Sequence, residues 1–345
     1  MKYSSVTIKD IAHALNLSVS TVSRALRDSY EISEGTKKIV TDYAKSVNFR
    51  PNPSALNLKE RRTHTIGIVV PEIANHFFSQ AINGIESVAQ QYGYNVIIAQ
   101  TFEHYEKEVE IIYNLAQSVD GMLISLSAET KNMEHLHSIH EKGMPIVFFD
   151  RVNESLKVHK VISNNYKSAF DATTYLLDNG YKRIALIGHD ANLSITHERE
   201  RGYTDALKAR GITPLEKYMK CCMHGGLIFE EVEDAINQLL KIKPRPDSIF
   251  CGTDKITTNS LRILQQKHIR IPEDIALIGF SNFELTDLLT PTLSVIKQDA
   301  HTMGVKATEL LIKQIESKRP ILDFEEIILD AILYIRSSTE KVTKK

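Results

Sequence analysis

From Thr65 onward, short apolar runs alternate with segments of helical periodicity. The runs are almost continuously apolar, which is typical of parallel strands covered on both faces by helices. There are too many such units for one sheet, so we expect an α/β core of two doubly wound parallel-sheet lobes. Ligands bind such sheets beyond the carboxyl ends of the strands. The predicted strands are 66–71, 95–99, 121–126, 145–150, 183–188, 247–252, 275–280, 293–297 and 331–336, and helices are predicted around 82–89, 109–115, 136–139, 166–179, 196–210 and 300–317, with another that ends near 267.

Ahead of this core, the segment from Thr7 to Leu26 predicts two short helices joined by a tight turn. Thr7 followed by Asp10 is a helix-capping pair, and the apolar residues after it recur every three or four positions. Asn16 stands where the turn needs a left-handed residue, and Ser18 can cap the second helix. The pattern therefore predicts a helix-turn-helix.

The second helix, from Val19 to about Leu26, is predicted to leave small polar residues and an arginine outside. Val22, Ala25 and Leu26 face inward, whereas Val19, Ser20, Ser23 and Arg24 face outward. Short side chains let a helix approach base edges in the major groove, and an arginine can bond guanine with two donors. Taken alone, the segment favours an ordinary helical hairpin over a DNA reader.

A third helix is expected from the Ser33 cap to about Asn48. Its apolar stripe would close a small three-helix core and consists of Ile39, Val40, Tyr43, Ala44 and Val47. Pro51 and Pro53 then open a linker, in which residues 54–59 are too few to hold a helix alone. We therefore expect the linker to be helical only under certain conditions.

The charge distribution is uneven, although the formal net charge of the whole chain is −1. Residues 1–62 carry 11 Lys and Arg against 6 Asp and Glu, while the remaining residues carry 31 against 37. A basic head on an acidic body suits a small nucleic-acid-binding module attached to a larger domain. A secretory signal and an apolar run of membrane-spanning length are both absent from the sequence, so we expect a cytoplasmic protein.

The sequence motifs argue against several kinds of chemistry. The three cysteines, Cys221, Cys222 and Cys251, contain no CxxC pair, and we expect no metal site. His135, His137 and His140 are expected on a solvated helix face. There is no GxGxxG after a strand, no GxxxxGK[ST], no GxSxG and no HExxH, so nothing in the sequence points to an enzyme.

The order and spacing of these parts resemble the lactose-repressor/galactose-repressor (LacI/GalR) family of transcription regulators. The resemblance is carried by VTIKDIAHALNLSVSTVSRAL, FRPNPSALNLKERRTHTIGIV, IALIGFSNFELTDLLTPTLSVIKQDAHTMG and YIRSST, and it spans the chain. It implies a homodimer on a near-palindromic operator, with a periplasmic-binding-protein-like (type I) core that senses a small molecule. The expected domains are an all-α head at 1–50, a hinge at 51–62 and the core at 63–345, with an N-lobe of 63–163 plus 294–325 and a C-lobe of 164–290 plus 326–345.

The resemblance also assigns DNA-binding residues. Val19, Ser20 and Arg24 match the base-reading positions of the family, and Leu58 matches the hinge leucine that family members wedge into the minor groove. An apolar wedge of this kind unstacks a base step and bends the duplex. Asn57 and Lys59 are expected to contact sugar and phosphate. The full set is Thr7, Val19, Ser20, Thr21, Ser23, Arg24, Asn52, Ala55, Asn57, Leu58 and Lys59.

For the effector, the resemblance implies a site in the cleft between the lobes. Arg199 matches an arginine that holds effectors in the family, and Asp150 ends a strand where a carboxylate can accept bonds from hydroxyl groups. The family often has Asp in place of Ser281 or Asn282, and Asp-Asn in place of Asn164-Asn165, so the effector specificity is left open. The predicted effector residues are Phe77, Phe78, Asp150, Arg151, Arg199, Phe250, Asp254, Ser281 and Asn282.

Three alternatives remain open at this point. A sugar or sugar derivative is the effector that the resemblance implies, with no other cofactor. Control by a protein co-regulator is the second reading of the same DNA-binding protein. A solute-binding protein or an enzyme on the same core is the third, and the first 60 or so residues would then have no purpose.

Overall fold

A computed structural model describes residues 6–49 and 62–341. The chain forms two compact units, Met1–Thr63 and His64–Lys345, which are described separately below. The predicted hinge residues Asn52, Ala55, Asn57, Leu58 and Lys59 lie outside the described residues, so their roles stay predictions. Among the described residues, no helix combines the length and the apolarity that crossing a membrane requires.

The head is a three-helix unit whose helices begin where the sequence predicts. The hydroxyl of Thr7 accepts a bond from the Asp10 N–H, and the Asp10 side chain accepts one from the Thr7 N–H at 2.7 Å. Asn16 has a φ of +51°, which gives the left-handed turn between the first two helices. The serine caps Ser18 and Ser33 are both present. The helices are α1 (Ile8–Ala14), α2 (Val19–Ala25) and α3 (Glu34–Ser46).

The head closes on a small apolar core in which Ile11, Val22 and Val40 are fully buried. One predicted core residue is wrong, because Ile39 is 59% exposed. Successive residues of a helix are about 100° apart, so the face that buries Val40 and Ala44 turns Ile39 toward solvent.

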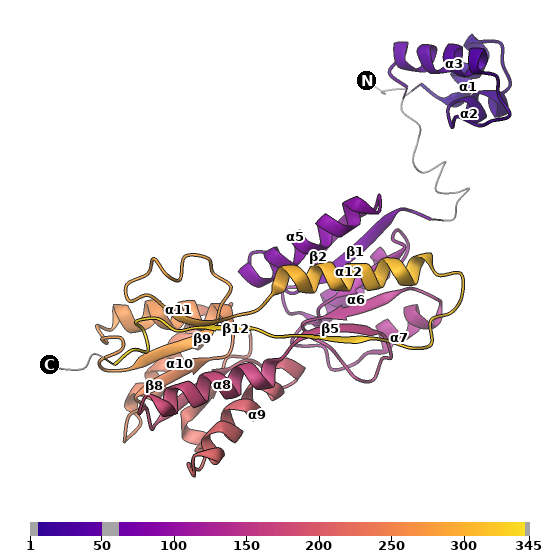
Figure 1. The fold of residues 1–345 in the computed structure, drawn as a ribbon. Helices are drawn as coiled ribbons and strands as arrows, with labels where there is room; N and C mark the ends of the chain where they lie inside the picture. The colour runs from indigo at the N-terminus through magenta and orange to yellow at the C-terminus, as the bar shows by residue number, and fades with distance from the viewer. Residues whose placement is uncertain (1–5, 50–61, 342–345) are drawn as a thin grey trace. The chain divides into compact units, whose positions relative to one another are not determined.

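The core contains two six-stranded sheets, one in each lobe (Figure 1). The N-lobe sheet has the order β11-β5-β4-β3-β1-β2, and every neighbouring pair in it is parallel. The C-lobe sheet has the order β12-β10-β9-β8-β6-β7, with β12 antiparallel at its edge. The strands are β1 (Thr65–Val70), β2 (Asn95–Gln100), β3 (Gly121–Ile124), β4 (Ile146–Phe149), β5 (His159–Ser163), β6 (Ile184–Gly188), β7 (Met219–Cys221), β8 (Ser248–Cys251), β9 (Ala276–Phe280), β10 (Ser294–Lys297), β11 (Glu326–Leu329) and β12 (Ile332–Tyr334).

Helices cover both sheets, as the apolar strands require. Buried residues of the N-lobe form two apolar clusters, one on each face of its sheet, and the C-lobe has two further clusters. The helices of the N-lobe are α5 (His76–Gln91), α6 (Tyr105–Leu115), α7 (Glu134–Glu141) and α12 (Ala300–Glu316), and those of the C-lobe are α8 (Asn165–Asp178), α9 (Ser194–Ala209), α10 (Phe229–Lys241) and α11 (Asp254–Gln266).

The chain passes between the lobes three times, and two of the predicted boundaries are wrong. The first crossing follows β5, as expected. The second follows β10, which pairs with β9 of the C-lobe, so 294–297 does not belong to the N-lobe. The third follows β11, which pairs with β5 of the N-lobe, so 326–329 does not belong to the C-lobe. Strand pairing determines the positions of both boundaries, and the apolar pattern of the sequence does not record strand pairing.

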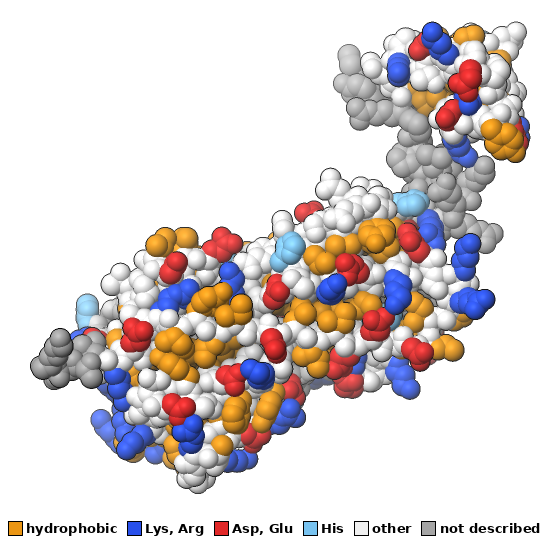
Figure 2. All heavy atoms as spheres, viewed as in Figure 1, with side chains coloured by type: hydrophobic (Ala, Val, Ile, Leu, Met, Phe, Trp, Pro, Cys, Tyr) orange, Lys and Arg blue, Asp and Glu red, His pale blue; other side chains and the backbone are white. Residues whose placement is uncertain are grey.

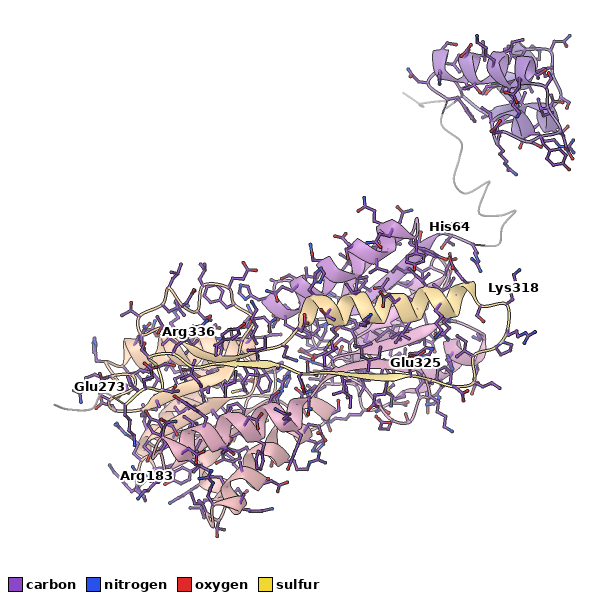
Figure 3. All side chains as sticks on the ribbon, viewed as in Figure 1. His64, Arg183, Glu273, Lys318, Glu325 and Arg336 are labelled. Carbon is purple, nitrogen blue, oxygen red and sulfur yellow. The ribbon has the colours of Figure 1, made fainter. Side chains whose placement is uncertain are left out.

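The last crossing makes one extended segment, 326–334, the edge strand of both sheets. It begins directly after Glu325 at the N-lobe and ends two residues before Arg336 at the C-lobe, and both residues are labelled in Figure 3. Ile328 and Ile332 on this segment are 54% and 59% exposed. Figure 2 shows that hydrophobic side chains are interspersed with charged ones over both lobes on this face.

Helices α5 and α12 cross in close contact through a glycine on each. A Cβ on Gly84 would lie 2.2 Å from the His301 carbonyl oxygen, and one on Gly304 would lie 2.0 Å from the Ala81 carbonyl oxygen. Since real Cβ atoms do not come so close to backbone oxygens, only glycine permits this separation between the helices. The crossing places the start of α5, which carries site residues, firmly against the rest of the N-lobe.

The expectation of a solvated face for three histidines is wrong for His135. This side chain is 2% exposed, and its Nε2 lies 3.1 Å from the carboxylate of Glu108, which is itself fully buried. The Glu108 carboxylate also accepts bonds from the Ser127 N–H and the Thr130 hydroxyl, both at 2.8 Å. The two residues are therefore part of a buried polar network beneath the loop after β3.

Candidate DNA interface and ligand cavity

The outer face of α2 carries the predicted base-reading residues. Val19 is 46% exposed, and Ser20 and Arg24 are exposed as well. Thr21 and Ser23 are partly buried. The face is formed because Val22 and Ala25 bury the opposite side of the helix. It therefore presents short side chains and one arginine, as recognition in the major groove requires.

Several of these groups already have partners within the head. The Ser18 hydroxyl lies 2.8 Å from the hydroxyls of both Ser20 and Thr21. The Thr7 hydroxyl donates to the Asp10 carboxylate in the cap of α1. Arg24 forms an ion pair with Glu31 at 2.9 Å, and both side chains remain largely exposed. Such a pair is weak, so DNA can replace it. The sequence did not predict this pair. Glu31 lies seven residues after Arg24 and beyond the end of α2, so helical spacing does not connect the two residues.

In the core, a cavity of about 40 Å³ lies between the lobes. Its N-lobe wall comes from the start of α5 and the end of β4, and its C-lobe wall comes from the carboxyl ends of β8 and β9 and from α9. All the predicted effector residues line it except Phe250. The lining residues are Asn75, Phe77, Phe78, Asp150, Arg151, Ile195, Arg199, Thr253, Asp254, Phe280, Ser281, Asn282 and Gln298.

The expectation for Phe250 is wrong. Its side chain is fully buried in a cluster inside the C-lobe, and its ring centroid lies 6.1 Å from that of Phe280. Phe280, the last residue of β9, takes the expected place at the cavity. Sequence reasoning found the correct edge of the sheet but chose the aromatic residue of the neighbouring strand.

Asp150 lies at the N-lobe side of the cavity with one carboxylate oxygen free. It follows β4 with a φ of +60°, and it is 5% exposed. Its Oδ1 is buried and has no hydrogen-bond partner. Burial raises the pKa of Asp150, although Arg199 and Arg151 nearby oppose the rise. A buried acceptor without a donor is costly, and a ligand hydroxyl at this point would supply one.

Arg199 lies opposite, on α9, and is held by three acceptors. Its Nε donates to Asn165 Oδ1 at 2.8 Å, one terminal nitrogen donates to the Gly252 carbonyl, and the other donates to Gln298 Oε1 at 3.3 Å. The guanidinium lies 3.7 Å above the centre of the Phe280 ring. Burial lowers its pKa to about 10, so it remains a cation at neutral pH.

Arg151 is occupied mainly within the protein. One of its terminal nitrogens donates to both carboxylate oxygens of Glu103, at 2.7 and 2.9 Å. Burial alone would raise the pKa of Glu103, but Arg151 and His189 hold it well below its ordinary value. His189 comes from the C-lobe, and its Nε2 lies 3.6 Å from Glu103. This cluster therefore joins the lobes. It leaves the Nε of Arg151 buried without a hydrogen-bond partner that the structure describes.

Further polar contacts hold the lobes together at the α5 side. His76 Nδ1 lies 3.1 Å from Asp254, whose other oxygen accepts the Ser281 hydroxyl. Asn282 Nδ2 donates to Gln80 Oε1 at 2.7 Å. The His76 and Phe283 rings are 4.8 Å apart. The lobes are therefore closed on one another. A cavity of this size has room for roughly one water molecule, so a sugar-sized ligand requires the lobes or the side chains to move.

Comparisons with known proteins agree with this geometry. Residues 63–328 match the family described as periplasmic binding proteins and sugar binding domain of LacI family. Residues 7–52 match the family of bacterial regulatory proteins, lacI family. The chain belongs to the LacI family. It is a DNA-binding transcriptional regulator in which the head binds DNA and a small molecule acts through the core.

Individual relatives of this LacI-family chain match nine-tenths or more of its length. It is 33% identical over 313 residues to the HTH-type transcriptional repressor PurR of Vibrio atlanticus (strain LGP32), covering 90% of this chain and 92% of that protein. It is 32% identical over 336 residues to the HTH-type transcriptional repressor CytR of Escherichia coli (strain K12), covering 96% of each. A crystal structure of the lac repressor dimer bound to operator and the anti-inducer ONPF shares the fold, with a TM-score of 0.81, 22% identity, and coverage of 97% of this chain and 99% of that chain.

Proposed function

We propose that this regulator is a homodimeric repressor that binds a near-palindromic operator in the bacterial cytoplasm. A hydroxyl-bearing small molecule, of the sugar or sugar-derivative class, controls it from the cavity between the lobes. The protein acts by binding and not by catalysis. Family membership supports the DNA-binding role, and the relatives that are named repressors support repression of transcription. The comparisons give no support to control by a protein co-regulator.

The observation that carries the effector proposal is the pairing of Asp150 and Arg199 across one cavity. Asp150 offers a buried oxygen that lacks a donor, and Arg199 lines the opposite wall with its guanidinium stacked on Phe280. An acceptor, fixed donors and an aromatic face suit a ring that carries hydroxyl groups. Since the two residues belong to different lobes, a ligand that contacts both favours one arrangement of the lobes over another.

A thermal-shift screen on the full-length protein tests this proposal. The panel contains neutral sugars, uronic acids, nucleobases, nucleosides and sugar phosphates, and any ligand that raises the Tm is then added to an operator-binding assay. Asp150→Asn should remove most of the shift, whereas Asp171→Asn, which changes a half-exposed helix carboxylate, should not. A ligand that still binds fully to both Asp150→Asn and Arg199→Lys would show that the site lies elsewhere.

The dimer is tested separately by sedimentation velocity with and without operator DNA. We expect two chains on each operator. One chain on a full operator would contradict the homodimer.

A further inference from the structure

The C-lobe contains a cavity that is larger than the interlobe cavity lined by Asp150 and Arg199. Its volume is about 250 Å³. At about 30 Å³ for each water molecule, it has room for roughly eight, which is close to one substituted ring. It lies between α9, the carboxyl end of β6 and the edge strand β7. Its lining residues are Leu186, Gly188, His189, Ala191, Thr196, Arg199, Glu200, Glu216, Met219, Lys220, Cys221 and Gly252.

The two cavities share one wall. Of all the residues that line them, Arg199 alone is common to both. Its guanidinium is bound to the Gly252 carbonyl on the C-lobe side and to Gln298 on the side of the interlobe cavity. A ligand that binds Arg199 from the interlobe cavity therefore has the C-lobe cavity directly behind the residue it contacts.

The inner end of the C-lobe cavity carries a polar group without a partner. Thr196 is 7% exposed, and its hydroxyl is buried with no hydrogen-bond partner. A hydroxyl can both donate and accept, but here the Thr196 methyl carbon faces Gly188, so a ligand hydroxyl would reach this group only after the side chain rotates. The wall beside it is apolar, because Leu186 and the Thr196 methyl group face the same space as Gly188.

The outer end carries both signs of charge. Glu200, Glu216 and Lys220 line the cavity, and none of them forms an ion pair with another residue that the structure describes. Two carboxylates disfavour an anion, while Lys220 and Arg199 disfavour a cation. Groups that both donate and accept, such as hydroxyls, satisfy all of these side chains.

We propose that the effector site is bipartite: one ring of the effector binds between the lobes, and a second, neutral, hydroxyl-bearing ring binds in the C-lobe cavity, with Arg199 between them. The proposal rests on the proposed function, because it assumes an effector between the lobes.

Gly188 offers a way to fill the C-lobe cavity without disturbing its walls. A Cβ there would meet only the Lys220 carbonyl oxygen and the Thr196 methyl carbon, each at 3.9 Å, which is ordinary contact. Gly188→Ala therefore adds a methyl group with little strain, and Gly188→Leu fills more of the space. Gly252 is unsuitable, because a Cβ there would lie 3.2 Å from a backbone oxygen.

The test compares paired ligands on the full-length protein: maltose with glucose, adenosine with adenine, and any hit of the wider panel with its single-ring fragment. We expect the two-ring member to bind at least tenfold more tightly than its partner. Gly188→Leu should abolish that gain while leaving the single-ring affinity unchanged, and Gly188→Ala should reduce it in part. Equal affinity of the two members, or an equal loss for both in Gly188→Leu, would overturn the bipartite site.

Cys221 gives a second readout that does not depend on a substitution in the cavity. It is exposed and lines the cavity, whereas Cys222 and Cys251 are buried. Burial and neighbouring carboxylates raise the pKa of Cys221, so the reaction with a chromogenic disulfide is best followed near pH 8.5. A saturating two-ring ligand should slow this reaction several-fold, and Cys221→Ser should abolish the signal.

Failure of this inference is distinguishable from failure of the proposed function. Loss of binding in Asp150→Asn, with Cys221 unprotected and Gly188→Leu without effect, overturns the bipartite site and leaves the interlobe site standing. Binding that Asp150→Asn does not affect removes the interlobe site, and the bipartite arrangement fails with it.

Discussion

At the scale of single residues, Asp150 shows how a binding group can lower stability. Its buried oxygen has no donor, and burial raises its pKa. Its positive φ suits Asn as well as Asp. The missing donor is therefore a cost that the free protein bears until a ligand hydroxyl binds.

We predict that Asp150→Asn raises the Tm of the free protein. A group whose pKa is raised on folding contributes stability below its unfolded pKa and loses it as the pH rises through the folded pKa. The advantage of the variant should therefore be larger at pH 8 and should shrink as the pH falls toward the ordinary carboxylate pKa. Calorimetry across this range, with and without ligand, measures it. A lower Tm at pH 8 would contradict the assignment.

Arg24 is the residue at which an internal partner competes with DNA. It pairs with Glu31 on the exposed face of the head. We predict that Glu31→Gln tightens operator binding at low salt, because the arginine no longer has to exchange a carboxylate for a base.

Arg24→Lys provides the opposite change. Because lysine lacks the planar pair of donors, we expect a loss of about 1–3 kcal/mol on operator. Fluorescence anisotropy with operator and with random DNA distinguishes contact of Arg24 with a base from contact with a phosphate. An equal loss on both DNAs would place Arg24 on phosphate instead of a base.

The site residues that the sequence predicted share a simple property: they lie next to an apolar run or on a recognisable helix. Asp150 and Ser281 directly follow strands, so the rule that ligands bind at the carboxyl ends finds them. Gln298 lies on a crossing between the lobes, and its importance depends on which sheet β10 joins. Asn165 matters only through its bond to Arg199. The sequence pattern of a single chain does not record which strands pair or which distant side chains bond.

At the scale of secondary-structure elements, the strands missed by the sequence are short, lie at an edge or begin with polar residues. β5 begins with His and Lys, β7 has three residues, and β11 alternates exposed and half-buried positions at the rim of its sheet. None has the continuous apolar run of a buried strand. The long apolar strands were predicted because burial on both faces leaves a strong signal.

The crossing of α5 and α12 gives a prediction at this scale. Gly304→Ala places a methyl group on the Ala81 carbonyl, so the helices must separate. Overpacking of this kind costs about 1–3 kcal/mol. Gly35→Ala is the matched control, because a Cβ there meets nothing within 4 Å and alanine favours the helix. Urea unfolding measures both, and an unchanged midpoint for Gly304→Ala would mean that the crossing is looser than described.

At the scale of the whole molecule, the closed lobes meet through side chains that a reporter can monitor. The sequence contains no tryptophan, and Phe283 of the C-lobe contacts the His76 ring of the N-lobe. We predict that Trp in the Phe283→Trp variant is quenched by His76 while the lobes are closed. Lys255→Ala removes the ion pair between Lys255 and Glu72, whose charged atoms are 3.6 Å apart. Because this change favours opening of the lobes, it should raise the Trp emission and shift it to the red. His76→Ala removes the quenching side chain and should by itself raise the emission. If neither Lys255→Ala nor His76→Ala changes the emission, the lobes are not closed at this contact.

The shared edge segment, 326–334, bears on how the protein is made. The N-lobe sheet lacks its last strand until Leu329 has been synthesised, and the C-lobe sheet lacks its own until Tyr334 follows. Both lobes are thus completed almost together, long after the head, whose last helix ends at Ser46. Because domains fold as units in the order of their synthesis, a nascent chain carries a folded DNA-binding head long before the core that controls it. A chain that ends before residue 326 would therefore have a complete head but would lack the edge strand of both sheets of the core that controls it.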